Sequence, residues 1–220
     1  MRETRHILDA KKQQIEENLL DLFDVVQRAI GEAINCLDSA EKQACQVVID
    51  RDPQINEARR LLEQDCLVAI ASQQPVAHDL RDIVACMRIA TELERIGDYA
   101  SDIAASVLQM EGNDLQHIGL AAVLGMSRTC IEMLDGVSHA FRERDSSLAK
   151  TYALMDDQID QAQQELDETL FDSMKSQPGL VPDASRMLWI THNLERCGDR
   201  ATNIAEQVVF MVESKNMELD

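Results

Sequence analysis

Two pairs of acidic residues stand four positions apart at equivalent places in the chain: Glu94 with Asp98, and Glu195 with Asp199. Four residues are about one turn of an α-helix, so the two carboxylates of each pair would lie on one helix face. Carboxylate oxygens that converge on one face bind hard or borderline cations. The alternative interpretation is a solvated acidic face whose repulsion is offset by salt bridges to arginines of the same helix.

Further carboxylates precede each of these pairs on a predicted neighbouring helix. Asp52 with Asn56, and Asp156 with Asp160, are again four positions apart. If each of these pairs faces the acidic pair of its own half, the oxygens form a multi-carboxylate site for one or more metal ions. The predicted metal ligands are Glu94, Asp98, Glu195, Asp199, Asp52, Asp156 and Asp160.

A histidine and two glycines lie close in sequence to the predicted metal ligands. His192 lies three residues before Glu195 and could add a nitrogen ligand. The first half has Thr91 at the equivalent position, so a packing or surface histidine is the preferred interpretation. Gly97 and Gly198 lie inside the two acidic motifs, where a glycine lets a neighbouring helix approach closely. We therefore expect each motif to border a helix contact.

Sequence motifs of catalytic sites are absent. The patterns GxSxG, GxxxxGK[ST], HExxH and GxGxxG do not occur. A di-iron carboxylate bundle needs two inward-facing Glu-x-x-His motifs, and this spacing is found only from Glu3 to His6, near the terminus. The sequence predicts neither an enzyme nor an organic cofactor.

Charge and composition exclude other classes of protein. The 220 residues include 21 Lys and Arg against 40 Asp and Glu, a formal net charge of −19, so the chain lacks the basic patch that nucleic acid needs. It also lacks an apolar run of about 18 residues, the length of a membrane span. Six cysteines without a CxxC pair suggest neither a disulfide framework nor a zinc knuckle. We expect a cytoplasmic protein.

The elements that must position the acids are helices. With 8 glycines, 4 prolines and 3% aromatic residues, the composition predicts an all-α protein. Asp52 and Pro53 are read as the N-cap and first residue of a helix. The predicted helices are 6–39, 53–73, 76–110, 114–143, 154–176 and 183–214, with short extra turns at 41–50 and 146–153.

The two acidic motifs belong to an internal repeat. RIATELERIGDYASDIAA at 88–105 aligns without gaps with WITHNLERCGDRATNIAE at 189–206, with 9 identities in 18 positions. Both halves also follow the same order of a long, a shorter and a long helix. The sequence therefore predicts two tandem three-helix bundles related by duplication, at 1–111 and 112–220.

The repeat carries a family resemblance. SQQPVAHDLR at 72–81, ELERIGD at 92–98 and the later NLERCGDRATNIAE at 193–206 resemble the motifs of the PhoU family. The resemblance implies a cytosolic, often dimeric regulator of bacterial phosphate homeostasis without catalytic activity. Its implied partners are the ATP-binding subunit of the phosphate ABC transporter and the phosphate-sensing histidine kinase, which it links so that phosphate uptake and the starvation response stay low.

The resemblance also bears on the acidic residues. Members of the family can carry multinuclear iron or zinc sites on paired E(D)xxxD motifs, which map onto the ligands named above. This chain departs from the family pattern at His78, at Asn56 and at Arg200, which stands beside Asp199 and could neutralise it. Two alternatives stay open: a PhoU-like paralogue that regulates another transporter or metal homeostasis, and a metal-binding carboxylate bundle.

Overall fold

The computed structural model describes residues 2–39, 42–111 and 119–219. Within these residues the chain is helical, as predicted, with seven α-helices and one short 3-10 helix. The elements are α1 (Arg2–Ser39), α2 (Lys42–Gln73), α3 (His78–Leu108), α4 (Leu120–Glu143), α5 (Ser146–Ala153), α6 (Asp156–Ser176), η1 (Pro178–Leu180) and α7 (Val181–Glu213). No helix among the described residues is long and apolar enough to cross a membrane.

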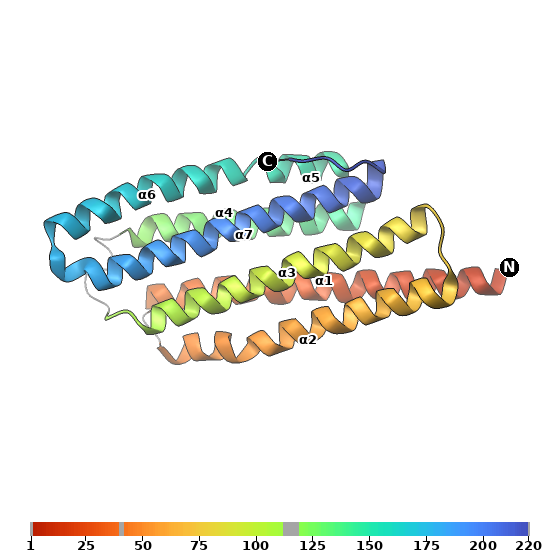
Figure 1. Cartoon of the computed structure of the whole chain (residues 1–220), viewed down its shortest axis with the longest axis horizontal. Helices are drawn as coiled ribbons and strands as arrows, with labels where there is room; N and C mark the ends of the chain where they lie inside the picture. Colours follow the sequence, from red (N-terminus) through yellow and green to blue (C-terminus); the bar gives the residue numbers. More distant parts are fainter. Residues whose placement is uncertain (1, 40–41, 112–118, 220) are drawn as a thin grey trace.

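The helices form two bundles that lie side by side with their long axes nearly parallel (Figure 1). The first contains α1, α2 and α3, and the second contains α4, α6 and α7 with the short α5 added. The helices that carry the repeated motifs, α3 and α7, pack against each other at the centre, and α1 packs against α4. The predicted boundary at 111/112 lies partly outside the described ranges.

The prediction that Asp52 and Pro53 begin a helix is wrong. The predicted short turn at 41–50 and the predicted helix at 53–73 form one helix, α2, with Pro53 in its interior. A proline inside a helix costs about 3 kcal/mol, because it removes one hydrogen bond and its ring crowds the preceding turn. Apolar side chains on both sides of Pro53 are buried in the bundle, and the Val, Ile and Leu among them each contribute about 1.5–3 kcal/mol. They are Cys45, Val48, Ile55, Leu62, Cys66 and Ala69.

Other helix ends are set by capping side chains and by residues with a positive φ. The Asp145 carboxylate accepts hydrogen bonds from the backbone N–H groups of Ser147 and Leu148, at 2.9 and 3.0 Å, and so caps α5. Helix α3 begins at His78, two residues later than predicted, after Ala77 adopts a positive φ of 45°. The chain reverses at Ser214, and the Leu219 N–H then donates to Glu206 Oε1 at 2.9 Å.

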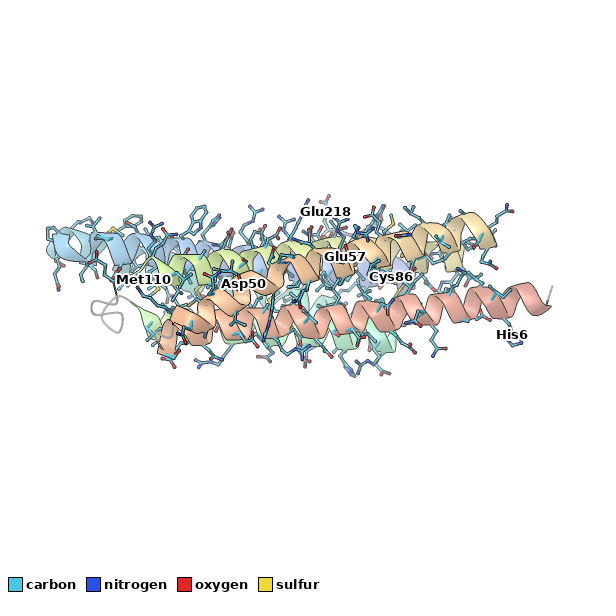
Figure 2. All side chains as sticks on the ribbon, turned by 90° about the horizontal axis from the view of Figure 1, so that it is seen from below. His6, Asp50, Glu57, Cys86, Met110 and Glu218 are labelled. Atoms are coloured by element: carbon cyan, nitrogen blue, oxygen red, sulfur yellow. The ribbon has the colours of Figure 1, made fainter. Side chains whose placement is uncertain are left out.

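Polar side chains cover the outside of the bundle, and apolar side chains fill its core. Figure 2, a view from the α2 side, shows the outward-pointing charged groups, with Asp50 and Glu57 labelled on α2. The core includes Leu93 and Leu194, which flank the two acidic motifs and are fully buried. Each acidic motif therefore lies on a helix whose opposite face is fixed in the core.

A buried ionic network joins the two bundles. Asp82 of α3 has a side chain that is only 1% exposed, and it contacts Lys12 Nζ of α1 at 2.6 Å and Arg144 Nη1 at 3.2 Å. Arg144 follows the last residue of α4 in a left-handed conformation and also contacts Glu16 Oε1 of α1 at 2.6 Å. Lys12 pairs with a second buried acid, Asp79, at 2.8 Å. The network thus ties α1, α3 and the end of α4 together.

Candidate functional site

The first acidic cluster lies where α2 and α3 meet. Asp52 of α2 and Glu94, Asp98 and Asp102 of α3 belong to this cluster, and the charge of Asp52 acts on the Asp98 carboxylate. Partial burial, together with the charges of Asp52, Glu94 and Asp102, raises the pKa of Asp98 to about 6. Burial and Asp52 also raise the pKa of Asp102 above its ordinary value. The ionised cluster is therefore electrostatically strained, and added positive charge would relieve it.

Neighbouring polar groups hold two members of this cluster in place. The Asn56 amide donates to Asp52 Oδ2 at 3.1 Å, along the same face of α2. Arg59, one turn further along α2, places Nη2 3.5 Å from Glu94 Oε1. Arg59 was not among the predicted site residues, because a contact between two helices leaves no spacing signal in the sequence.

The second acidic cluster lies where α6 and α7 meet. Burial, followed by the charge of Asp199, raises the pKa of both Asp160 and Glu195. His192 Nδ1 lies 3.5 Å from Glu195 Oε2, with the His192 side chain 45% exposed. Arg196 Nε lies 3.8 Å from Asp199 Oδ2. The structure therefore brings the predicted acids of the second half together, and it places the histidine at their edge.

Asp156 occupies a different position from its counterpart Asp52. The Thr202 hydroxyl of α7 donates to Asp156 Oδ2 at 3.3 Å. A Cβ atom added to Gly198 would lie 2.3 Å from Asp156 Oδ1. Glycine at this position is thus what allows the Asp156 carboxylate to lie against the backbone of α7.

The expectation that Arg200 neutralises Asp199 is wrong. Arg200 Nη1 contacts Glu92 Oε2 of α3 at 3.3 Å, across the contact between the two bundles. Successive residues of a helix point about 100° apart, so Asp199 faces α6 while Arg200 faces α3. The residue near Asp199 is Arg196, three positions earlier on the same face.

The donors of the two acidic clusters suit a metal ion in their chemistry but not yet in their arrangement. Carboxylates from two helices suit hard or borderline cations, and both clusters contain acids with raised pKa values. In the part of the chain that the structure describes, however, no three His, Cys, Asp or Glu side chains are already arranged to hold a metal. The donors fit in kind, and binding would require the side chains to turn toward the ion.

The arrangement matches that of known proteins. The family model "PhoU domain" matches the chain twice, at residues 19–107 and 123–208. The chain belongs to the PhoU family. The first match ends within α3 and the second within α7, so each PhoU domain contains one acidic cluster together with the helix contact that forms it.

PhoU relatives are similar over nearly the whole chain. A PhoU homologue of the phosphate-specific transport system from Streptococcus pneumoniae is 30% identical, covering 98% of this chain and 100% of its own. The Escherichia coli PhoU accessory protein is 26% identical, over 94% of this chain and 86% of its own.

Two crystal structures of PhoU share the architecture. The regulatory protein PhoU from S. pneumoniae aligns with a TM-score of 0.90 at 29% identity, covering 96% of this chain and 99% of its own. PhoU from Pseudomonas aeruginosa also aligns with a TM-score of 0.90, at 30% identity, over 94% and 99% of the two chains.

Proposed function

We propose that this protein is a regulatory accessory protein of bacterial phosphate transport, which holds phosphate uptake and the phosphate-starvation response low when phosphate is plentiful. The observation that carries the proposal is similarity over the full length: 98% of this chain aligns with 100% of a relative described as a phosphate transport accessory protein. Both PhoU domains are present, in the order and packing of the solved PhoU structures.

The proposed mechanism is that of an adaptor. In the cytoplasm, a homodimer of the protein docks on the ATP-binding subunit of the phosphate ABC transporter and on the phosphate-sensing histidine kinase, and it reaches the membrane through these partners alone. It catalyses no reaction itself. The exposed acidic edges of α3 and α7, which include Asp98 and Asp199, are the proposed docking face. Switching requires two states of the protein that differ in affinity for the two partners.

Deletion of the gene in the source organism tests this function. In phosphate-replete medium we expect a phosphate-starvation reporter to rise in the deletion strain and to return to its low level with a wild-type copy. A Glu195→Ala/Asp199→Ala copy should leave the reporter high, because it removes the charge of the second acidic cluster. Immunoblots at matched expression check that the variant accumulates.

The matched control is Glu168→Ala/Asp172→Ala, which removes two acids at the same spacing from the exposed face of α6. This copy should repress the reporter like the wild type. An unchanged reporter in the deletion strain would contradict the proposal, and it would favour the paralogue that regulates another transporter or metal homeostasis. Isolation of membrane partners would then show a transporter other than the phosphate ABC system.

We also propose that the acidic clusters bind divalent cations, with iron or zinc as the candidate ions, in a multinuclear site. The specific observation is the set of acids whose pKa values are raised by burial and then by their acidic neighbours: Asp98, Asp102, Asp160 and Glu195. A bound cation would supply positive charge that favours the ionised form of these acids. Asp52, Glu94 and Asp98 would hold the ion in the first half, and Asp156, Asp160, Glu195 and Asp199 in the second.

The substitution Asp98→Asn distinguishes two effects of the Asp98 charge: repulsion among the acids of the first cluster, and binding of a metal ion. Because the folded-state pKa of Asp98 is about 6 against an ordinary 3.8, its contribution to stability is present below about pH 4 and is lost as pH rises through 6. The variant should therefore be more stable than the wild type at pH 7.5 without metal. The side chain is solvent-exposed and screened, so we expect a gain of about 1 kcal/mol in urea unfolding.

With zinc present, we expect the wild type to become more stable than Asp98→Asn. The wild type should gain more stability than Asp98→Asn, by about 2.7 kcal/mol at a zinc concentration one hundred times the dissociation constant. Asp172→Asn, at an exposed acid paired with Lys175, serves as the control and should show neither effect. Equal responses of wild type and Asp98→Asn to zinc would show that the first cluster does not bind the ion.

A further inference from the structure

Helix α2 has apolar residues on two of its sides. One side is buried in the first bundle, where α2 packs against α1 and α3. The other side carries Val47, Gln54 and Leu61, all of them exposed, with Val47 at 44% and Leu61 at 47%. Residues seven positions apart lie almost on one line along a helix, as they do in a coiled coil. These three residues form an outer stripe that the described part of the chain leaves exposed.

A groove runs along the outer stripe, between α2 and α1, which lie side by side in both views (Figures 1 and 2). It consists of three hollows of about 320, 310 and 270 Å³. The first and second share Val25 and Gln54, and the second and third share Glu32 and Arg51, so the hollows are continuous. On α1 the groove covers residues 18–39, which is about 30 Å of helix. These dimensions suit a further helix lying along α1 and α2.

The groove is balanced in charge, although the chain has a formal net charge of −19. Its charged lining residues are Asp21 and Glu32 of one sign, and Arg28 and Arg51 of the other. Two copies of so acidic a chain repel each other over most of their surfaces. A second copy therefore approaches most easily at this groove, whereas a basic partner is drawn to the acidic clusters instead.

The outer stripe is complementary to a second copy of itself. In an antiparallel pair of α2 helices with a two-fold axis at Gln54, each residue is level with the residue equally far beyond position 54 in the other copy. Val47 is then level with Leu61 of the second copy, and Arg51 with Glu57. The two Gln54 amides meet at the axis, where each can donate and accept a hydrogen bond. This pairing sets apolar residues against each other and a positive charge beside a negative one.

We propose that two copies of this protein associate through the outer stripes of α2, antiparallel and centred on Gln54, with α1 of each copy beside α2 of the other. The proposal rests on the homodimer of the proposed function and assigns the surface through which it forms. The contact leaves the first acidic cluster uncovered. That cluster lies between α2 and α3, where Arg59 contacts Glu94, and the groove lies between α2 and α1.

Arg51 and Glu57 already have surface partners within each copy. Arg51 Nη1 is 2.5 Å from Glu32 Oε2, and Arg60 Nη2 is 2.7 Å from Glu57 Oε1. The four side chains are at least 42% exposed, so these pairs contribute little to the stability of the single chain. In the dimer, Arg51 of one copy also meets Glu57 of the other, so the four charges alternate in sign.

Analytical ultracentrifugation of the purified full-length protein measures the association. A contact between single helices is at the small end of stable interfaces, so we expect monomer to convert to dimer between about 1 and about 100 µM. Leu61→Asp should weaken the dimer about a hundredfold, because it places a carboxylate in the apolar part of the contact. Leu67→Asp is the matched control. Leu67 is 53% exposed but lies about 120° from Leu61 around α2, so its substitution should leave the dimer unchanged.

Exchanging the charges tests the register of the two helices. Arg51→Glu should weaken the dimer about tenfold, because it sets like charges beside each other at two symmetry-related places. Glu57→Arg should have the same effect for the same reason. The double variant Arg51→Glu/Glu57→Arg should bind at least about threefold more tightly than either single variant, since it restores opposite charges across the contact. Circular dichroism checks that each variant is folded.

A cysteine at the two-fold axis tests the geometry directly, because it faces its own copy. Gln54→Cys should form a disulfide between two chains under mild oxidation, seen as a covalent dimer that a thiol reductant splits. Gln64→Cys is the matched control, with the same substitution at another exposed position of α2. Its two copies would lie about 30 Å apart in the proposed pairing, so it should not cross-link. The native cysteines are buried and stay out of the reaction.

Three results would overturn the proposal. One is a wild type that stays monomeric at the highest concentration, which would leave the groove to a helix of another protein. The others are a dimer that Leu61→Asp leaves intact, and cross-linking of Gln64→Cys as readily as Gln54→Cys; both would place the contact on another face. None of them bears on the deletion experiment, in which the reporter rises whichever surface the copies share. The interface and the regulatory function can therefore fail separately.

Discussion

Replacing Lys12 with methionine should lower the free energy of unfolding by about 3–5 kcal/mol. The Lys12 ammonium pairs with two buried acids, Asp79 at 2.8 Å and Asp82 at 2.6 Å, whose side chains are 9% and 1% exposed. Burial alone would lower the pKa of Lys12, but the hydrogen bonds to these acids raise it above the ordinary 10.5. Methionine fills a similar volume without the charge, so two carboxylates would remain buried with too little positive charge.

Urea unfolding at pH 7.5 measures the effect, with Lys11→Met as the control. Lys11 is next to Lys12 on α1, and the ion pairs of the described residues do not include it, so its substitution should change stability by no more than about 0.5 kcal/mol. Equal effects of the two substitutions would mean that Arg144 balances Asp82 on its own. At that point Asp82→Asn, rather than Lys12→Met, would be the destabilising change.

The network around Asp82 shows where prediction from sequence ends. Lys12, Asp82 and Arg144 are separated by 70 and 62 positions along the chain, so no helical spacing connects them. The acids of the candidate site were predictable, because residues four positions apart share a face of a helix and the repeat marks them twice. A contact within one helix leaves a periodic signal in the sequence. A contact between helices depends on how the helices pack, and the residue spacing does not reveal this.

The course of α2 and the direction of Arg200 illustrate the same limit. Pro53 carries a strong local signal for the start of a helix, yet burial on both sides of it keeps α2 continuous. Arg200 follows Asp199 in the chain, but the helical turn directs it to Glu92 of the other bundle. In both places packing between helices outweighs the local signal, and the same packing decides how the two PhoU domains meet.

The duplicated motifs have diverged in their contacts more than in their residues. In the first PhoU domain burial and the charge of Asp52 raise the pKa of Asp98, whereas in the second the counterpart of Asp52, Asp156, accepts a hydrogen bond from Thr202. The glycines of the two motifs also differ in what they contact: Gly97 lies against an apolar side chain, and Gly198 lies against a carboxylate. A Cβ atom at Gly97 would meet two methyl carbons of Ile55 at 3.0 Å. At Gly198 the contacts would be Asp156 Oδ1 at 2.3 Å and Ile159 Cδ1 at 3.0 Å.

Gly198→Ala should therefore lower the free energy of unfolding by about 1–3 kcal/mol, as overpacking in a core does. The new methyl group must displace the Asp156 carboxylate from α7 and break its hydrogen bond with Thr202. The better helix propensity of alanine, worth about 0.5–1 kcal/mol, offsets only part of this cost. Thermal and urea unfolding of the metal-free protein at pH 7.5 measure the difference.

Gly97→Ala is the matched control, because it adds the same methyl group at the equivalent position of the other repeat. The Ile55 side chain needs to move by only a few tenths of an ångström there, so the packing cost and the gain in helix propensity should nearly cancel. If Gly198→Ala is as mild as Gly97→Ala, the Asp156 carboxylate turns away from α7 at little cost. Its position in the second cluster would then be adjustable, and a metal ion could recruit it without distorting the helix contact.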